Sequence, residues 1–194
     1  MSILHIKNAE EFNRLCPLAG VVAADKEVYD DPLRGPLVVP WKRSCLSELG
    51  FPADFSIEQI ISGTNNLGAI RGIHIGPGRK IVFAEYSGIE GASDEYVVHK
   101  ALIETKAGPD FGKKFEFTFN SRIMIFLPEG IGNSYQMLKQ DGRYTYLCDK
   151  EYDGKAPAIH PLDPELNISW PIKPLISIKD SNNGSLADLR SALR

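Results

Sequence analysis

Two short apolar runs, Ala69-Ile70-Arg71-Gly72-Ile73-His74-Ile75 and Lys80-Ile81-Val82-Phe83-Ala84, carry single polar residues and are bounded by turn residues. This pattern is typical of strands. Side chains alternate between the two faces of a strand, so Arg71 and His74 are expected on opposite faces. If both residues serve one site, the strand must bend near Gly72, as an interior glycine permits.

Eight such runs follow one another between Phe55 and Cys148, and no stretch among them has convincing helical periodicity. They cover residues 56–62, 68–75, 80–86, 96–105, 114–120, 122–127, 134–139 and 143–148. Gly, Asn and Pro separate them at the spacing of an all-β sandwich or barrel. The sequence therefore predicts a closed or doubly layered antiparallel sheet, and eight strands favour a jelly roll, the double-stranded β-helix.

The flanking segments add short elements. Residues 3–6 and 37–39 are expected as strands, and a helix is expected after Asn8, which is a favourable N-cap. A further short helix is predicted over residues 44–50, and Ser185 is expected to cap a surface helix after a Pro-rich tail. We expect one domain over residues 1–194, with an N-terminal arm (about 1–54), a barrel core (about 55–160) and a C-terminal extension (about 161–194).

Composition narrows the possible partners. The chain has 194 residues and 43% hydrophobic content, enough for one well-buried core. Its 22 Lys and Arg against 25 Asp and Glu give a net charge of −3 without a basic block, so nucleic acid is not expected as a partner. No apolar run of about eighteen residues and no signal-peptide pattern is present. We therefore expect a cytoplasmic protein that does not bind membranes.

The histidines and cysteines do not form a metal-binding pattern. Jelly rolls that hold a metal commonly use two His at i and i+2, a carboxylate and a third His, but Gly76 stands two residues after His74. His5, His99 and His160 lie in unrelated segments, and the three cysteines read as buried thiols. We expect no metal site, and His74 alone would usually be a hydrogen-bonded core histidine.

Five short motifs occur in order along the chain. They are Ile70-Arg71-Gly72-Ile73-His74, Arg79-Lys80-Ile81-Val82, Pro128-Glu129-Gly130-Ile131-Gly132-Asn133-Ser134-Tyr135, Tyr146-Leu147-Cys148-Asp149-Lys150-Glu151-Tyr152, and Leu162-Asp163-Pro164-Glu165-Leu166-Asn167-Ile168-Ser169-Trp170-Pro171 with Leu175-Ile176-Ser177-Ile178-Lys179-Asp180 after it. Together they resemble the dTDP-4-dehydrorhamnose 3,5-epimerase family, cupin-like jelly-roll enzymes. The resemblance covers about residues 29–180 and implies a cofactor-free homodimer that epimerises nucleotide-linked 4-keto-6-deoxy sugars.

The resemblance also implies roles for individual residues. A proton next to a ketone is acidic only if the enolate oxygen is stabilised, so such a site needs a base, an oxyanion partner and an acid. His74 would be the base, and Asp163 would orient it and stabilise its imidazolium. Lys80 would lie beside the C4 oxygen, and Tyr146 would reprotonate the carbon from the opposite face.

Further residues are implied in substrate binding. Arg71 would bind the diphosphate, for which a guanidinium is well shaped, with Arg34 assisting from a partner subunit. Gln59 would contact the nucleotide, Asn133 would hydrogen-bond the sugar or its ketone, and Tyr152 would also lie at the substrate.

Residue types alone leave plainer readings open. Asp163 before Pro164 could open a turn. Tyr146 and Tyr152 could be ordinary strand aromatics. Lys80 could be a surface lysine at the start of a strand.

The chain also departs from the family pattern. Asn133 stands where the family has a second histidine, and the segment from His74 to Lys80 is shorter than usual. We expect an isomerase with an altered substrate, in deoxysugar, surface-glycan or secondary-metabolite biosynthesis. The inverted centre (C3, C5 or both) and the nucleotide (dTDP, GDP or CDP) stay open. The alternatives are a nucleotide-sugar 3,4-ketoisomerase of the same fold and a catalytically silent sugar-nucleotide-binding jelly roll.

Overall fold

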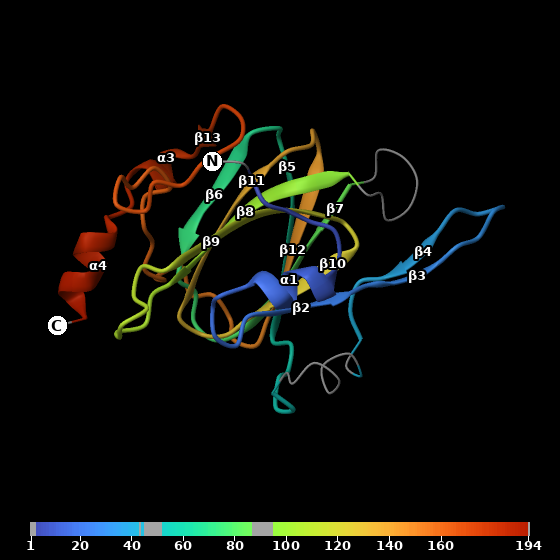
Figure 1. Cartoon of the computed structure of the whole chain (residues 1–194), viewed down its shortest axis with the longest axis horizontal. Coiled ribbons are helices and arrows are strands. Elements are labelled where there is room, and N and C mark those ends of the chain that lie inside the picture. The colour runs from blue at the N-terminus through green and yellow to red at the C-terminus, as the bar shows by residue number, and fades with distance from the viewer. Residues whose placement is uncertain (1–2, 43, 45–51, 87–94, 194) are drawn as a thin grey trace.

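Two sheets face each other in the computed structural model, which describes residues 3–42, 44, 52–86 and 95–193 (Figure 1). The six-stranded sheet has the order β1 (His5–Ile6), β9 (Lys114–Asn120), β8 (Tyr96–Glu104), β11 (Ile131–Met137), β6 (Ala69–His74) and β13 (Leu175–Ile176). The five-stranded sheet has the order β2 (Val22–Asp25), β10 (Ile123–Leu127), β7 (Lys80–Glu85), β12 (Gly142–Cys148) and β5 (Gln59–Asn65). This arrangement confirms the predicted all-β jelly roll, although the two sheets do not close into one barrel.

All eight predicted central strands are present. The bounds differ most for β5, predicted over 56–62 but observed over Gln59–Asn65, and next for β11, predicted over 134–139 but beginning at Ile131. Gly132 and Asn133 resemble turn residues in sequence. In the structure β11 lies between β8 and β6, so both residues are paired within the sheet. Tertiary pairing therefore overrides their weak strand propensity.

The predicted bend of β6 occurs as a register shift against β11. Asn133 lies opposite His74 and Tyr135 lies opposite Arg71, so two residues of β6 face a single residue of β11. Such a bulge re-aims the side chains that follow it. Arg71 and His74 can thereby serve the same side of the sheet, as expected from Gly72.

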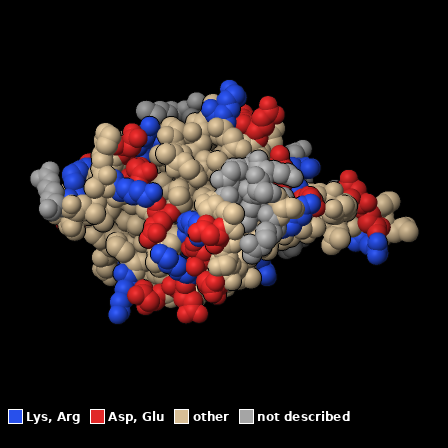
Figure 2. Space-filling model, turned by 90° about the horizontal axis from the view of Figure 1, so that it is seen from below, with Lys and Arg blue, Asp and Glu red and all other residues tan. Residues whose placement is uncertain are grey.

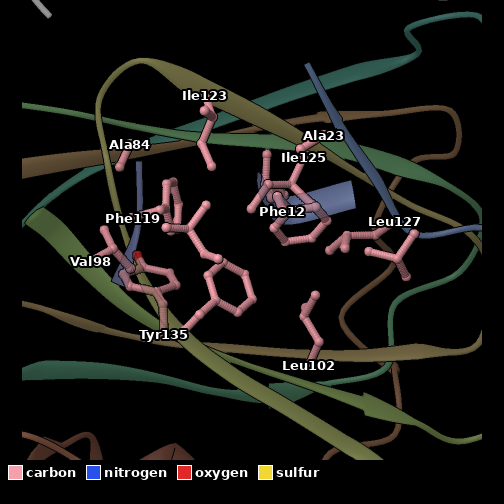
Figure 3. Packing of buried hydrophobic residues seen from close by; sticks show 14 of the residues in the cluster. Phe12, Ala23, Ala84, Val98, Leu102, Phe119, Ile123, Ile125, Leu127 and Tyr135 are labelled. Carbon is pink, nitrogen blue, oxygen red and sulfur yellow. The ribbon is translucent and has the colours of Figure 1, made fainter. Parts of the chain in front are cut away.

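The apolar core fills the space between the sheets (Figure 3). Phe12, from helix α1 (Ala9–Leu15), packs edge-on against Phe117 with ring centroids 5.1 Å apart. The predicted cap of this helix is confirmed, because the Asn8 side chain accepts a hydrogen bond from the Glu11 backbone N–H at 2.9 Å. Helix α1 is thus anchored to the core by an aromatic side chain.

The remaining elements lie outside the two sheets. The hairpin of β3 (Glu27–Tyr29) and β4 (Leu37–Val39) projects away from them, and α3 (Ile178–Ser181) and α4 (Leu186–Ala192) follow the Pro-rich tail (Figure 1). The predicted Ser185 cap of α4 is confirmed by a capping box with Asp188. The helix predicted over residues 44–50 and Cys45 lie outside the described residues, apart from Ser44. Cys148 is buried as predicted, whereas Cys16 is only half-buried.

Acidic and basic side chains are interspersed over the face shown in Figure 2, with no block of basic residues on it. Among the described residues, no helix is both long and apolar enough to cross a membrane.

Candidate active site

A cavity of about 380 Å³ opens between the two sheets, lined from β6 and β11 on one side and from β5, β7 and β12 on the other. Six of the nine predicted site residues line it: Arg71, His74, Lys80, Asn133, Tyr146 and Tyr152. Arg71 and His74 contribute together because of the bulge in β6. The structure therefore gathers residues that are up to 81 positions apart in the sequence around one space.

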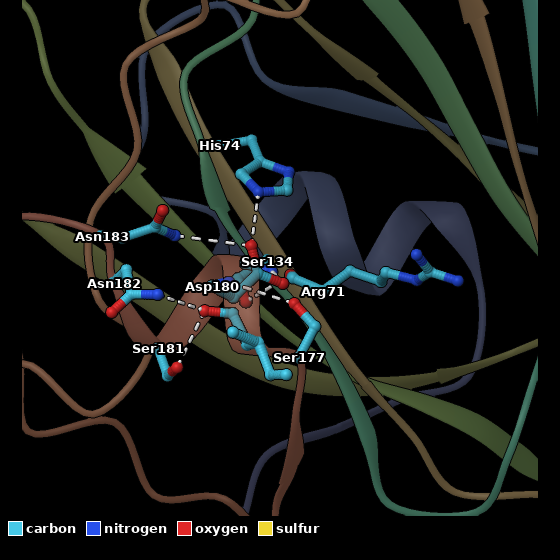
Figure 4. A network of polar contacts seen from close by, with 10 residues as sticks. Arg71, His74, Ser134, Ser177, Asp180, Ser181, Asn182 and Asn183 are labelled. Atoms are coloured by element: carbon cyan, nitrogen blue, oxygen red, sulfur yellow. Dashed lines mark hydrogen bonds and ion pairs between the residues drawn. The ribbon is translucent and has the colours of Figure 1, made fainter.

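His74 is paired with a buried carboxylate, that of Asp180 in α3 (Figure 4). Nε2 of His74 lies 2.9 Å from Oδ1 of Asp180, and the other carboxylate oxygen accepts the backbone N–H of Gly72 at 3.4 Å. Burial acts to raise the pKa of Asp180, but hydrogen bonds from His74 and Gly72 and the charge of His74 outweigh it and lower that pKa. Asp180 is thus held as a carboxylate beside the imidazole.

The prediction that Asp163 orients His74 is wrong. Oδ1 of Asp163 accepts the backbone N–H groups of Glu165 and Leu166 at 2.8 and 3.2 Å, and Oδ2 accepts that of Leu186 at 2.9 Å. The carboxylate is committed to the turn before the Pro-rich tail and to the start of α4. The plainer reading of Asp163 as a turn residue is the one that the structure supports.

The sequence does not predict a site role for Asp180, although this residue ends the last of the quoted motifs. The available signal was Ser177, three residues earlier, whose side chain accepts the Asp180 backbone N–H at 3.0 Å and caps α3. That pattern predicts a helix start rather than a histidine partner. The pairing becomes visible only when the C-terminal extension lies against β6.

Lys80 and Tyr146 belong to the sheet opposite His74. Lys80 begins β7 and is 7% exposed, and a Cβ placed on Gly76 would lie only 2.8 Å from its Nζ. Burial lowers the pKa of Lys80, while the neighbouring Cys148 and Asp149 act to raise it. A side chain at position 76 would therefore displace this amine from its present position.

Tyr146 packs among other aromatic side chains of the cavity. Its ring lies edge-on to that of Tyr144 with centroids 5.0 Å apart, and Tyr144 stacks on Tyr135 at 3.9 Å. Burial, followed by the proximity of Tyr135 and Tyr144, raises the pKa of Tyr146 well above its ordinary value. Its phenol is therefore protonated at neutral pH.

The mouth of the cavity is basic and carries an aromatic ring. Arg71, Lys150 and Lys179 line it, and Nζ of Lys179 lies 5.8 Å from the centroid of the Tyr152 ring. Arg71 is exposed, and its Nε donates to Oδ1 of Asn65 at 3.1 Å, so an amide rather than a carboxylate holds this guanidinium. The remaining guanidinium nitrogens of Arg71 are thus free of any carboxylate in the described part of the chain.

The two other predicted binding residues do not line the cavity. Gln59 supports its rim, because Oε1 of Gln59 accepts the Tyr152 backbone N–H at 2.9 Å. Arg34 lies at the turn of the projecting β3–β4 hairpin, where its guanidinium pairs with Asp31 at 2.5 Å. One copy of the chain therefore does not bring Arg34 to its own site.

Within the described ranges, no group of three or more His, Cys, Asp or Glu side chains is arranged to hold a metal ion. The fold and the cavity define a jelly-roll protein with titratable residues on both of the sheets that enclose its site. The chain belongs to the dTDP-4-dehydrorhamnose 3,5-epimerase family, whose model matches residues 16–188. This confirms the resemblance found in the sequence.

Two relatives with epimerase names are similar to the chain in sequence. It is 32% identical over 156 residues to the dTDP-4-dehydro-6-deoxyglucose 3-epimerase of Streptomyces bikiniensis, covering 76% of each chain. It is 34% identical over 131 residues to the dTDP-4-dehydrorhamnose 3-epimerase of Streptomyces niveus, covering 64% of this chain and 60% of that one.

Solved structures agree. ChmJ, a 3'-monoepimerase from Streptomyces bikiniensis in complex with dTDP-quinovose, superposes with a TM-score of 0.77 at 26% identity, covering 92% of this chain and 91% of that chain. NovW, a 4-keto-6-deoxy sugar epimerase from the novobiocin gene cluster of Streptomyces spheroides, gives a TM-score of 0.75 at 28% identity, covering 91% and 88%.

Proposed function

We propose that this protein is an epimerase that inverts C3, C5 or both in a nucleoside-diphosphate-linked 4-keto-6-deoxy sugar. The observation that carries this proposal is the placement of His74 and Tyr146 on opposite sheets with one cavity between them. Inversion requires that a proton leave one face of a carbon and that another arrive on the opposite face. A sugar ring between the two sheets would present one face to each residue.

The chemistry follows from these positions. His74 removes the proton on the carbon next to the ketone, and because its Nε2 is paired with Asp180, Nδ1 is the nitrogen that takes it. Asp180 stabilises the imidazolium that forms. The electron pair moves onto the C4 oxygen, where Lys80 offsets the negative charge. Tyr146 then donates its proton to the carbon from the other sheet. His74 releases the abstracted proton to solvent, and Tyr146 takes a proton from solvent, so both residues return to their starting states.

Substrate binding is assigned to the basic mouth. A diphosphate bound by Arg71, Lys150 and Lys179 would leave the sugar inside the cavity and the base near Tyr152. The named enzymes of Streptomyces bikiniensis and Streptomyces niveus are epimerases of dTDP-linked sugars, so we propose dTDP as the nucleotide. Deoxysugar or antibiotic biosynthesis is the setting that these relatives suggest.

We further propose a homodimer in the cytoplasm. The β3–β4 hairpin exposes Leu33 and Leu37 at 95% and 65%, and a second copy would cover them. The same contact would bring Arg34 toward a partner's cavity, the role predicted for it. Sedimentation analysis tests this: a monomer at micromolar concentration would contradict it.

The first experiment is proton NMR in heavy water with 4-keto-6-deoxy sugars linked to dTDP, GDP and CDP, heptoses included. Deuterium at C3, C5 or both would establish enolisation and identify the centre and the nucleotide together. Binding of the nucleotide sugars without exchange in any of them would support the catalytically silent binding module. The presence of Asn133 where the family has a histidine favours this alternative, because an amide does not titrate near neutral pH. A keto group moved to C3 would support the ketoisomerase.

Two substitutions test the proposed roles. His74→Ala should abolish exchange while nucleotide binding remains, because the mouth residues are untouched; unchanged exchange would remove His74 as the base. Tyr146→Phe should leave exchange on the His74 side in place while net inversion falls. Equal loss of both would instead assign Tyr146 to holding the substrate.

A further inference from the structure

A lysine lies under the floor of the cavity and has no place in the chemistry above. Lys100, in β8, is fully buried, and its Nζ donates to Oδ1 of Asn133 and to Oη of Tyr144, the latter at 2.6 Å. Asn133 belongs to the same sheet as Lys100, whereas Tyr144 belongs to the opposite sheet. The amine therefore ties the two sheets together directly behind two cavity-lining residues.

Among the described residues, the hydrogen-bond partners of Lys100 Nζ are Asn133 and Tyr144, and neither is acidic. The charge that acts on the pKa of Lys100 is that of another cation, Lys80. Burial first, and then Lys80, lower the pKa of Lys100 well below its ordinary value. Burying an amine without a counter-ion costs folding free energy, so a contribution to stability does not by itself explain why Lys100 lies here.

The contact with Asn133 fixes which way its amide points. An amine that donates to Oδ1 holds the amide oxygen toward β8, and the Nδ2 hydrogens must then point away from Lys100. Asn133 is 4% exposed and lies directly opposite His74 on the neighbouring strand. Side chains of such a pair are about 5 Å apart at Cβ, so a donor on Asn133 lies next to the proposed base.

We propose that Lys100 is a positioning residue that turns the N–H groups of Asn133 into the cavity, where they bind the C4 oxygen together with Lys80 as that oxygen becomes an enolate. The inference rests on the proposed function and deepens it. Asn133 then supplies a fixed hydrogen-bond donor where the family has a histidine, and Lys100 determines that it acts as a donor and not as an acceptor.

The test measures kcat and KM of deuterium exchange for Lys100→Met, Asn133→Ala and the double variant. Loss of one oxyanion donor costs about 100-fold or more in kcat, and we expect this for Asn133→Ala and about 10-fold or more for Lys100→Met. KM should change little, because the interaction strengthens in the transition state. The double variant should be no slower than Asn133→Ala, since Lys100 acts through that amide.

Lys26→Met is the matched control. Lys26 is also buried, and its Nζ donates to the Ala84 carbonyl at 3.1 Å away from the cavity lining, so its exchange rate should equal that of the unmodified protein. Asn133→Asp keeps an acceptor for Lys100 but has no N–H to donate, and it should lose exchange even if Lys100→Met does not fold.

The outcomes separate the two proposals. Exchange by Lys100→Met at the unmodified rate, multiplicative losses in the double variant, or full exchange by Asn133→Asp would each overturn the assignment of Lys100 and leave the epimerase proposal intact. Absence of exchange in the unmodified protein with every donor would refute the proposed function itself.

Discussion

Two parts of the C-terminal extension each hold a buried aspartate, and the two carboxylates do different work. Asp163, in the turn that precedes the Pro-rich tail, is 4% exposed, and Asp180, in α3, is 3% exposed. Among the described residues, the groups that donate to the Asp163 carboxylate are backbone N–H groups, those of Glu165, Leu166 and Leu186. Asp180 also accepts a backbone N–H, but its Oδ1 lies 2.9 Å from the imidazole of His74.

The difference shows that burial and residue type do not determine the role of a carboxylate; its partner does. A backbone amide cannot change its charge, so Asp163 can only fix the chain. An imidazole gains a charge when it accepts a proton, and a carboxylate beside it then becomes more favourable. Only Asp180 is therefore placed to act in proton transfer.

Among the substitutions that test this difference between the two aspartates, Asp180→Asn is expected to have the largest effect. The amide keeps the shape of the side chain but removes the charge that stabilises the imidazolium and allows the wrong tautomer of His74. We expect the exchange rate to fall on the order of 10²–10⁴-fold, as for a triad aspartate in a serine protease. NMR in heavy water measures this rate, and retained dTDP binding by calorimetry serves as its control. Full exchange by Asp180→Asn would remove the pair from the mechanism.

The corresponding substitution of the other aspartate, Asp163→Ala, should lower stability rather than activity. Three backbone N–H groups lose their acceptor, two of them in the turn and one at the start of α4. We expect the free energy of unfolding in urea to drop by about 2–3 kcal/mol. The exchange rate of the folded protein should stay close to normal. A large loss of exchange without loss of stability would restore the catalytic role first predicted for Asp163.

The sequence predicted the jelly roll and most of the cavity because their signals are local. Alternating apolar runs specify strands, and Arg71, Lys80 and Tyr146 lie within such runs. The partner of His74 depends instead on where a chain segment 106 residues later lies against β6. The sequence favours Asp163 as this partner because Asp163 lies in the more specific motif. The backbone N–H groups of the Pro-rich turn need an acceptor, however, and the Asp163 carboxylate is that acceptor.

Lys100 could not be predicted as a site residue from the sequence, for a related reason. A lysine amid apolar residues of a predicted strand gives no sign of what its amine reaches, and here the amine reaches two other strands, β11 and β12. Arg34 stayed outside the site because its predicted role needs a second chain. Both cases involve contacts between elements rather than the pattern within one element.

The smallest expected effect is a difference in stability at acid pH between the unmodified protein and Asp180→Asn. It would show how much the charge of Asp180 contributes to the fold. Its pKa in the folded protein is lowered, because the hydrogen bonds from His74 and Gly72 outweigh burial, which acts to raise it. A carboxyl of this kind stabilises the fold fully above its unfolded-state value near 4, and this contribution is lost as the pH falls through the lowered folded-state pKa. Urea unfolding measured between about pH 5 and pH 2.5 should therefore show a steeper loss of stability for the unmodified protein than for Asp180→Asn. Parallel curves for the two proteins would mean that the charge of Asp180 contributes nothing to the fold, and its contact with His74 would then have to act in catalysis alone.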